Sequence, residues 1–188
     1  MSYFVNAGVF LIQTIFDFLI GIFIVRVLLI AAGASFLDPV CQFVYRLTNP
    51  VLVPLRRLVP RWGKIETASV LIACVLALVE FALLGGLAGM RMSIVGWPLL
   101  SLVNVLSIAL WIMFWAIMIR CLLSFFVNEH YNSNARLLVQ ITEPIVRPIR
   151  RMLPALGGLD LSCWFASLAL ILARFLIVAP LSDLATRL

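Results

Sequence analysis

Four long apolar stretches limit this sequence to very few architectures. Each contains at least the roughly 20 residues that a helix needs to cross the hydrocarbon core of a bilayer. Because lipid offers the backbone no hydrogen-bond partners, apolar runs of this length indicate helices. We therefore predict an all-α membrane protein with four transmembrane helices, at about residues 9–32, 67–89, 100–126 and 161–183.

Composition supports this prediction, since 64% of the 188 residues are hydrophobic and only 12% are charged. A soluble domain is about half apolar and a quarter charged, so a soluble enzyme domain, a disordered chain and a secreted disulfide scaffold are excluded. The four cysteines form no CxxC pair, and we expect neither disulfides nor a metal site. The net charge of +6 fits loops beside anionic lipid headgroups, and we expect no direct contact with nucleic acid.

The two halves of the chain are copies of one another. Adding 94 to a residue number aligns them without a gap, and residues 47–60 then match residues 141–154 in three prolines, a double arginine and a threonine. The same offset pairs Arg26 with Arg120 and Glu66 with Asp160. We interpret this as a tandem repeat, with units at 1–94 and 95–188.

The distribution of basic residues predicts how the chain crosses the membrane. Both long loops, inside the first and inside the second repeat, are rich in arginine. The loop between the repeats has only Arg91, and the N-terminal tail has no basic residue. The positive-inside rule therefore places both long loops in the cytoplasm and both termini in the periplasm. The two repeats are then parallel, related by a pseudo-twofold axis along the membrane normal.

Each long loop begins with a short amphipathic helix. Asp38 and Pro39 are typical of a helix start, as N-cap and first helical residue. Polar residues then recur every fourth position, at Asp38, Gln42 and Arg46, and the second repeat has the same pattern at Asn132, Arg136 and Gln140. A narrow polar stripe favours a helix lying in the membrane surface. The alternative is a packed cytoplasmic helix.

The segment N/E-P-x-x-x-P-x-R-R-x-x-P follows this helix in both repeats. Two prolines four residues apart predict a kinked or extended chain at Pro54 and Pro148, because the second proline removes a helical hydrogen bond. The arginines would reach lipid phosphates or an acidic partner. The candidate partner- or lipid-binding residues are Asn49, Pro50, Pro54, Arg56, Arg57, Pro60, Pro144, Pro148, Arg150, Arg151 and Pro154.

Five charged residues fall inside the apolar stretches: Asp17, Arg26, Glu80, Arg120 and Arg174. Such groups cost roughly 2.5–3.5 kcal/mol each at the centre of a membrane helix, so they usually face the bundle and pair. We predict that Arg174 pairs with Glu80, Asp17 or both, and that Arg26 and Arg120 snorkel or bind loop carbonyls. Such a cluster serves either as polar contacts between helices or as an ion pathway.

Signatures of enzymes are missing from the sequence, which has no GxSxG, HExxH or Walker motif and a single histidine. We therefore expect no enzymatic activity and no cofactor.

The double-arginine and proline segment between apolar helices resembles the YggT (YlmG) family. The resemblance rests on the candidate docking residues, covers both repeats and is similar to the two-repeat proteobacterial form, which implies an inner membrane. Glu143 departs from the asparagine found at Asn49, so the second repeat is expected to differ there. Family membership implies roles in osmotic-shock tolerance and potassium homeostasis, and plastid relatives assist cytochrome b6 maturation. It implies no catalytic residue.

From these observations we expect a non-enzymatic inner-membrane scaffold or assembly factor in osmotic-stress tolerance. Its arginine and proline segments would dock a protein partner or anionic lipid. The alternative is a homo-oligomeric potassium or proton transport protein, or an accessory subunit of one, that depends on Asp17, Glu80 and Arg174. A lipid-binding organiser is a third interpretation.

Overall fold

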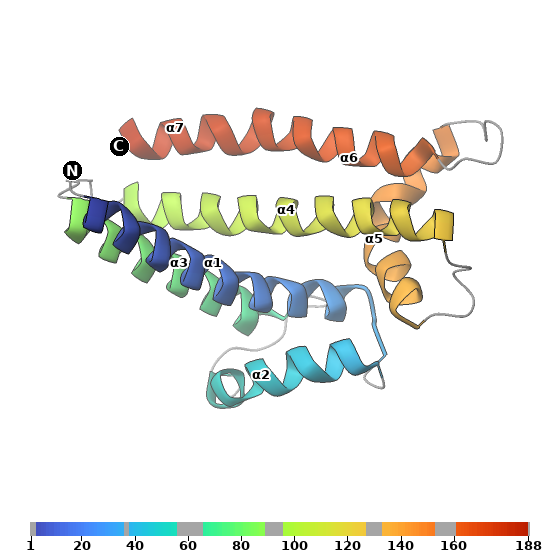
Figure 1. Cartoon of the computed structure of the whole chain (residues 1–188), viewed down its shortest axis with the longest axis horizontal. Coiled ribbons are helices and arrows are strands. Elements are labelled where there is room, and N and C mark those ends of the chain that lie inside the picture. The colour runs from blue at the N-terminus through green and yellow to red at the C-terminus, as the bar shows by residue number, and fades with distance from the viewer. Residues whose placement is uncertain are drawn as a thin grey trace.

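A computed structural model describes residues 3–35, 38–55, 66–88, 96–126, 133–152 and 161–187, and all regular structure among them is helical. Figure 1 shows the helices along the chain. In order they are α1 (Tyr3–Ala31), α2 (Pro39–Leu55), α3 (Thr67–Ala88), α4 (Gly96–Phe126), α5 (Ser133–Met152), α6 (Leu161–Ala173), a π-helical segment (Arg174–Val178) and α7 (Ala179–Arg187).

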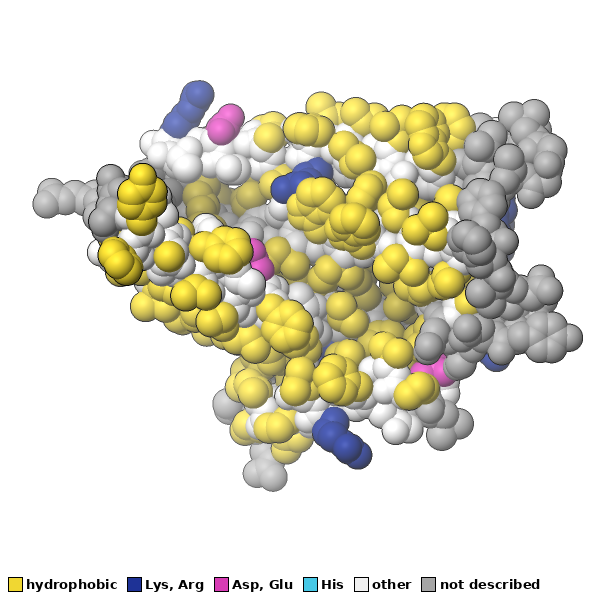
Figure 2. All heavy atoms as spheres, in the orientation of Figure 1, with side chains coloured by type: hydrophobic (Ala, Val, Ile, Leu, Met, Phe, Trp, Pro, Cys, Tyr) yellow, Lys and Arg dark blue, Asp and Glu magenta, His cyan; other side chains and the backbone are white. Residues whose placement is uncertain are grey.

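Four of these helical stretches are long and apolar enough to cross a membrane, and the fourth joins α6, the π-helical segment and α7 into one rod. They run along the long axis of the molecule, with α2 beside α1 and α5 near the end of α4 (Figure 1). The predicted all-α fold with four apolar helices is confirmed, and the chain is a multi-pass membrane protein. Figure 2 shows one face covered mainly by hydrophobic side chains, as expected for a surface in contact with lipid.

Two of the three core clusters are equivalent, one centred on each repeat, and the third joins Leu29, Val44 and Leu137 across the repeats. In the first, Leu52 of α2 packs with Ile20 and Phe23 of α1 and with Ala73 of α3. In the second, Val146 of α5 packs with Ile117 of α4 and Ala166 of α6. Because Leu52 and Val146 are 94 residues apart, each amphipathic helix buries the same position against its own repeat.

The third helix breaks the twofold relation between the repeats. In the described residues α3 packs against both α1 and α4, whereas the rod formed by α6 and α7 packs extensively against α4 and not against α1. Ser69, Ala73 and Ala77 explain part of this, since these small buried residues recur every fourth position and allow close approach. Gly85 continues the pattern: a Cβ there would lie 2.0 Å from Cη2 of Trp97 on α4.

Both proline pairs lie inside helices, Pro50 and Pro54 in α2 and Pro144 and Pro148 in α5. The extended alternative predicted at Pro54 and Pro148 is therefore wrong, because both residues lie within helices. Each proline removes one helical hydrogen bond, and its ring crowds the carbonyl four residues earlier, so a kink at each of these positions stays a prediction.

The π-helical segment lies just before Pro180, and this proline explains why the helix widens there. A proline at this position cannot donate to the carbonyl of Leu176, and its ring collides with that oxygen in a regular α-helix. The helix widens instead, and the backbone N–H of Ala179 donates to the carbonyl of Arg174, five residues earlier. The extra residue changes the direction in which side chains of this turn point.

Candidate functional site

Among the residues that the structure describes, Arg26 on α1 is the most completely buried charged residue, with 0% of its surface exposed. Its Nε donates to Oε2 of Glu66 at 2.7 Å, just before α3. Its Nη1 donates to Oγ1 of Thr48 and, at 3.0 Å, to Oδ1 of Asn49, both on α2. The guanidinium also lies 4.5 Å from the ring centroid of Tyr45. One side chain of α1 thus binds α2 and the start of α3 together.

Arg120 repeats this arrangement on α4. Its Nη1 donates to Oγ1 of Thr142 at 2.9 Å, and its Nη2 lies 3.2 Å from Oε2 of Glu143. Each partner is 94 residues from its counterpart in the first repeat. The counterpart of Glu66 is Asp160, which lies outside the described residues.

The threonines suit this role because their hydroxyls are already oriented. Thr48 donates to the carbonyl of Val44 at 2.7 Å, and Thr142 donates to that of Leu138 at 2.7 Å. With the proton directed along the helix, the lone pairs of the oxygen face the arginine. We call the two sets the arginine anchors: Arg26 with Thr48, Asn49 and Glu66, and Arg120 with Thr142 and Glu143.

The anchors correct one prediction. Arg26 and Arg120 neither snorkel nor bind loop carbonyls; they bind side chains of the amphipathic helices. The sequence analysis did not identify Thr48, Thr142 and Glu66 as partners of the arginines. The offset of 94 pairs Thr48 with Thr142 just as it pairs Arg26 with Arg120, and this parallel could have indicated the contact. Asn49 and Glu143 both face their arginine, so the difference between them exchanges an amide contact for an ion pair.

The predicted docking residues divide into described and undescribed groups. Pro50, Pro54, Pro144, Pro148, Arg150 and Arg151 are exposed on α2 and α5, and Asn49 is partly buried beneath them. Arg56, Arg57, Pro60 and Pro154 lie outside the described residues.

A polar crevice of about 510 Å³ separates α5 from the end of α1. Gln140 closes one side, donating from Nε2 to the carbonyls of Ala32 at 2.9 Å and Gly33 at 3.1 Å. Exposed Arg136 and Arg147 line it together with Glu143. These two arginines are eleven residues apart, three turns of one helix face, so both guanidiniums serve the same surface.

Two acids meet inside the first repeat. Nδ2 of Asn104 on α4 donates to Oε2 of Glu80 on α3 at 3.2 Å, and the Asn104 side chain also lies near Asp17 on α1. Glu80 is 2% exposed, whereas Asp17 is exposed. One amide thus lies near two carboxylates from different helices.

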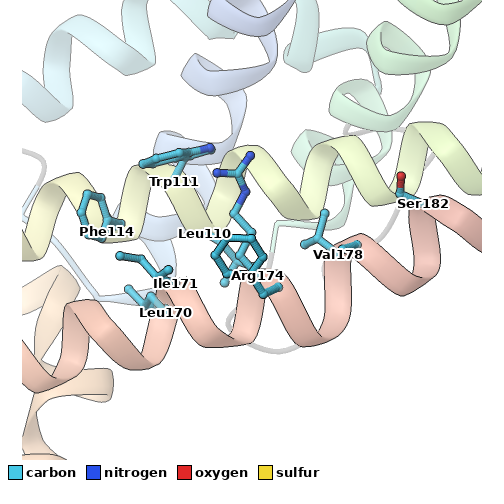
Figure 3. A pocket seen from close by; sticks show the side chains of 10 residues that line it. Leu110, Trp111, Phe114, Leu170, Ile171, Arg174, Val178 and Ser182 are labelled. Carbon is cyan, nitrogen blue, oxygen red and sulfur yellow. The ribbon is translucent and has the colours of Figure 1, made fainter.

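Arg174 is not part of this acidic cluster. Its guanidinium lies over the ring of Trp111, 4.4 Å from the centroid, beside a pocket of about 480 Å³ between α4 and the rod of α6 and α7 (Figure 3). Within the described part of the chain it forms no ion pair with Asp17 or Glu80, so the predicted pairing is wrong for a single chain. The offset of 94 relates Asp17 to Trp111 and Glu80 to Arg174, so two acids in one repeat correspond to a stacked cation in the other.

Metal-binding geometry is not found among the residues that the structure describes, where no three His, Cys, Asp or Glu side chains converge.

The profile of the CCB3/YggT family matches this sequence twice, over residues 5–87 and 99–181, once in each repeat. The chain belongs to the CCB3/YggT family. This confirms the resemblance drawn from the arginine and proline segments and the two-repeat form.

Relatives of similar length support this membership. An "uncharacterized protein in proC 3′ region" of Vibrio alginolyticus is 39% identical over 181 residues, 94% of this chain and 97% of the relative. An uncharacterised protein of Pseudomonas aeruginosa is 39% identical over 182 residues, 94% of this chain and 91% of its own. The Escherichia coli K12 protein YggT is 31% identical over 157 residues, 84% and 81% of the two chains. No solved structure matches.

Proposed function

We propose that this CCB3/YggT protein is a non-enzymatic inner-membrane scaffold. It holds α2 and α5 at the cytoplasmic surface, where they dock a protein partner or anionic lipid. The observation that carries the proposal is the repeated arginine anchor, in which Arg26 and Arg120 bind Thr48 and Thr142 at the same repeat position.

In each anchor a buried arginine fixes the position of an amphipathic helix. A buried arginine is costly unless it is hydrogen-bonded, and both arginines make polar contacts with residues of α2 or α5. The opposite faces of these helices remain open, with Phe43 66% and Val53 53% exposed on α2. Rigid placement of an open face is what recognition of a partner requires.

Arginine chemistry defines the ligand class. Arg136 and Arg147 line the crevice beside the end of α1, and Arg151 is exposed one turn beyond Arg147. Planar guanidiniums bind carboxylates and phosphates through paired hydrogen bonds. The ligand is therefore an acidic protein surface or an anionic phospholipid headgroup, and osmotic-stress tolerance is the proposed physiological setting.

The decisive experiment changes Arg136, Arg147, Arg150 and Arg151 together to Gln and compares the variant with Arg187→Gln. Arg187 is exposed near the end of α7, away from α5, so it controls for loss of charge. The four-residue variant should insert normally but fail to restore growth after osmotic shock in cells lacking the protein. It should also retain less anionic lipid on purification, or lose cross-links from a photoreactive residue at Val51. Full rescue with unchanged lipid and cross-links would overturn the proposal.

Ion transport is the second candidate, and the contact of Asp17, Asn104 and Glu80 favours it. Carboxylates inside a membrane are typical of proton and cation pathways. Four helices rarely enclose a pore, so this function requires several copies.

Liposome flux under a potassium or proton gradient distinguishes the two functions. The scaffold proposal expects no flux and full osmotic rescue by Glu80→Gln. Flux that Glu80→Gln abolishes, together with loss of rescue by the same variant, would favour transport instead.

A further inference from the structure

A single cation faces the pocket between α4 and the rod of α6 and α7. Apolar side chains such as Phe114, Leu170 and Val178 form most of its lining, and Ser182 adds one hydroxyl. Figure 3 shows the Arg174 side chain rising from the π-helical segment toward Trp111. The pocket is thus a hydrophobic groove with one positive charge.

The position of Arg174 raises the free energy of placing its charge in the membrane. It is the middle residue of the continuous helix Leu161–Arg187, thirteen residues from each end. At 1.5 Å per residue, either end is about 20 Å away, beyond the reach of snorkelling. Stacking on an aromatic ring offsets only part of the free energy that insertion of the charge at this depth costs. A carboxylate is needed to balance Arg174.

Asp17 is an acid at the same depth. It is the middle residue of α1, fourteen residues from each end, and its side chain is exposed. Its repeat counterpart is Trp111, the residue on which Arg174 stacks. Asn104 lies near Asp17 but carries no charge. Each chain therefore presents an exposed acid and a groove containing an unneutralised cation at the centre of the bilayer.

We propose that a second copy of this chain docks the Asp17 face of its α1 over the Arg174 pocket, so that the two side chains form an ion pair between copies. All copies insert in one orientation, which holds both residues at equal depth. Exposed apolar side chains flank both charges, Phe10 and Phe18 on α1 and Phe175 and Leu176 beside Arg174. Because acid and cation lie on different helices, α1 and the rod, the contact is head-to-tail and builds rings or rows of copies. This inference does not depend on the proposed docking role of α2 and α5.

Lipid is the weaker occupant of the pocket. Phospholipid charges lie at the membrane surface, and the hydrocarbon chains beside Arg174 offer no acceptor. A second copy supplies both the carboxylate and an apolar surface.

Disulfide cross-linking between differently tagged copies tests the proposal. Cys41, Cys74, Cys121 and Cys163 are first replaced by Ala. One tagged population then carries Asp17→Cys, and the other carries Arg174→Cys. Mild oxidation of membranes containing both should give a disulfide-linked dimer with both tags. Val79→Cys replaces Asp17→Cys in the control, because Val79 is exposed near the middle of α3, on another helix.

Cross-linking no greater than that of the Val79 control would overturn the proposal. A disulfide that forms only within one chain carrying both cysteines would also overturn it, since that chain would neutralise Arg174 by closing on itself.

Charge exchange provides a second readout that does not use cysteines. Asp17→Arg alone places two cations at the contact, and Arg174→Asp alone places two acids there, so each variant should be monomeric in mild detergent. Mixed together, the two variants regain opposite charges at both kinds of contact and should associate at least tenfold more than either alone. Two variants that stay monomeric when mixed, or a single variant that associates like the wild type, would contradict the ion pair.

Discussion

Arg26 and Arg120 make the same hydrogen bond in the two repeats, each to a threonine 22 residues further along the chain. Because both hydrogen bonds are buried, we expect each to contribute to the stability of the protein. It fixes an amphipathic helix to the first membrane helix of each repeat.

Loss of either threonine hydroxyl should destabilise the protein. Thr48→Val or Thr142→Val leaves a buried guanidinium N–H without its acceptor, which costs about 1–3 kcal/mol. Unfolding by denaturant in detergent measures this cost. Thr14→Val is the matched control, since Thr14 also donates to a carbonyl four residues earlier, at 2.8 Å, but is exposed. Equal losses for all three variants would show that the arginines contribute nothing.

Removal of Arg26 alone should cost more than removal of its whole ion pair. Arg26→Met leaves the buried carboxylate of Glu66 without its cation, although Ser69 still donates to it at 2.7 Å, and the expected loss is about 3–5 kcal/mol. Arg26→Met combined with Glu66→Gln removes both charges and should recover a large part of that loss. A double-mutant cycle on unfolding free energy measures the coupling, and additive losses would be evidence against a buried pair.

Two neighbouring glycines should respond oppositely to alanine. Gly85→Ala forces the Trp97 ring away from α3, because the new Cβ would lie 2.0 Å from Cη2 and 2.8 Å from Cζ2. We expect a loss of about 1–3 kcal/mol. Gly86 has no such neighbour within 4 Å, so Gly86→Ala should be neutral or stabilising by up to about 1 kcal/mol. Melting temperatures in detergent check the sign, and the same sign for both would contradict the packing of Trp97.

Replacement of Pro180 should convert the π-helical segment into a regular helix. Pro180→Ala restores a donor for the carbonyl of Leu176, so the extra residue in the turn is no longer favoured. Residues on the two sides of the segment then rotate relative to each other by about 100°. A cysteine scan from Ile171 to Ser182 with a membrane-permeant thiol reagent reports this as a shifted pattern of protection. An unchanged pattern would assign the π-helical segment to another cause.

The sequence was sufficient for the fold class, because apolar runs of this length leave a chain in lipid few alternatives. The sequence also showed that Arg26 and Arg120 occupy the same position in the two repeats. It did not identify Thr48 as the partner of Arg26, since that requires knowing which face of α2 meets α1. The sequence left open whether the chain is kinked or extended at Pro54 and Pro148, because the answer depends on the packing of Leu52 and Val146, which holds α2 and α5 in place.

Arg174 shows a different limit of sequence reasoning. Glu80 and Arg174 occupy the same position in their repeats, but this did not establish contact, because depth in the membrane fixes only one of three coordinates. The change of direction in the π-helical segment also depends on Pro180, whose counterpart in the first repeat is Gly86.

The unequal packing of α3 and the final rod has a consequence for biosynthesis. Since α3 contacts both α1 and α4, the first three membrane helices share their interfaces before the last one is made. The rod of α6 and α7 adds to a surface of α4 that is already in place. Shortened chains that end after α4 should therefore assemble a stable three-helix unit during translation, whereas chains that begin at α4 should not.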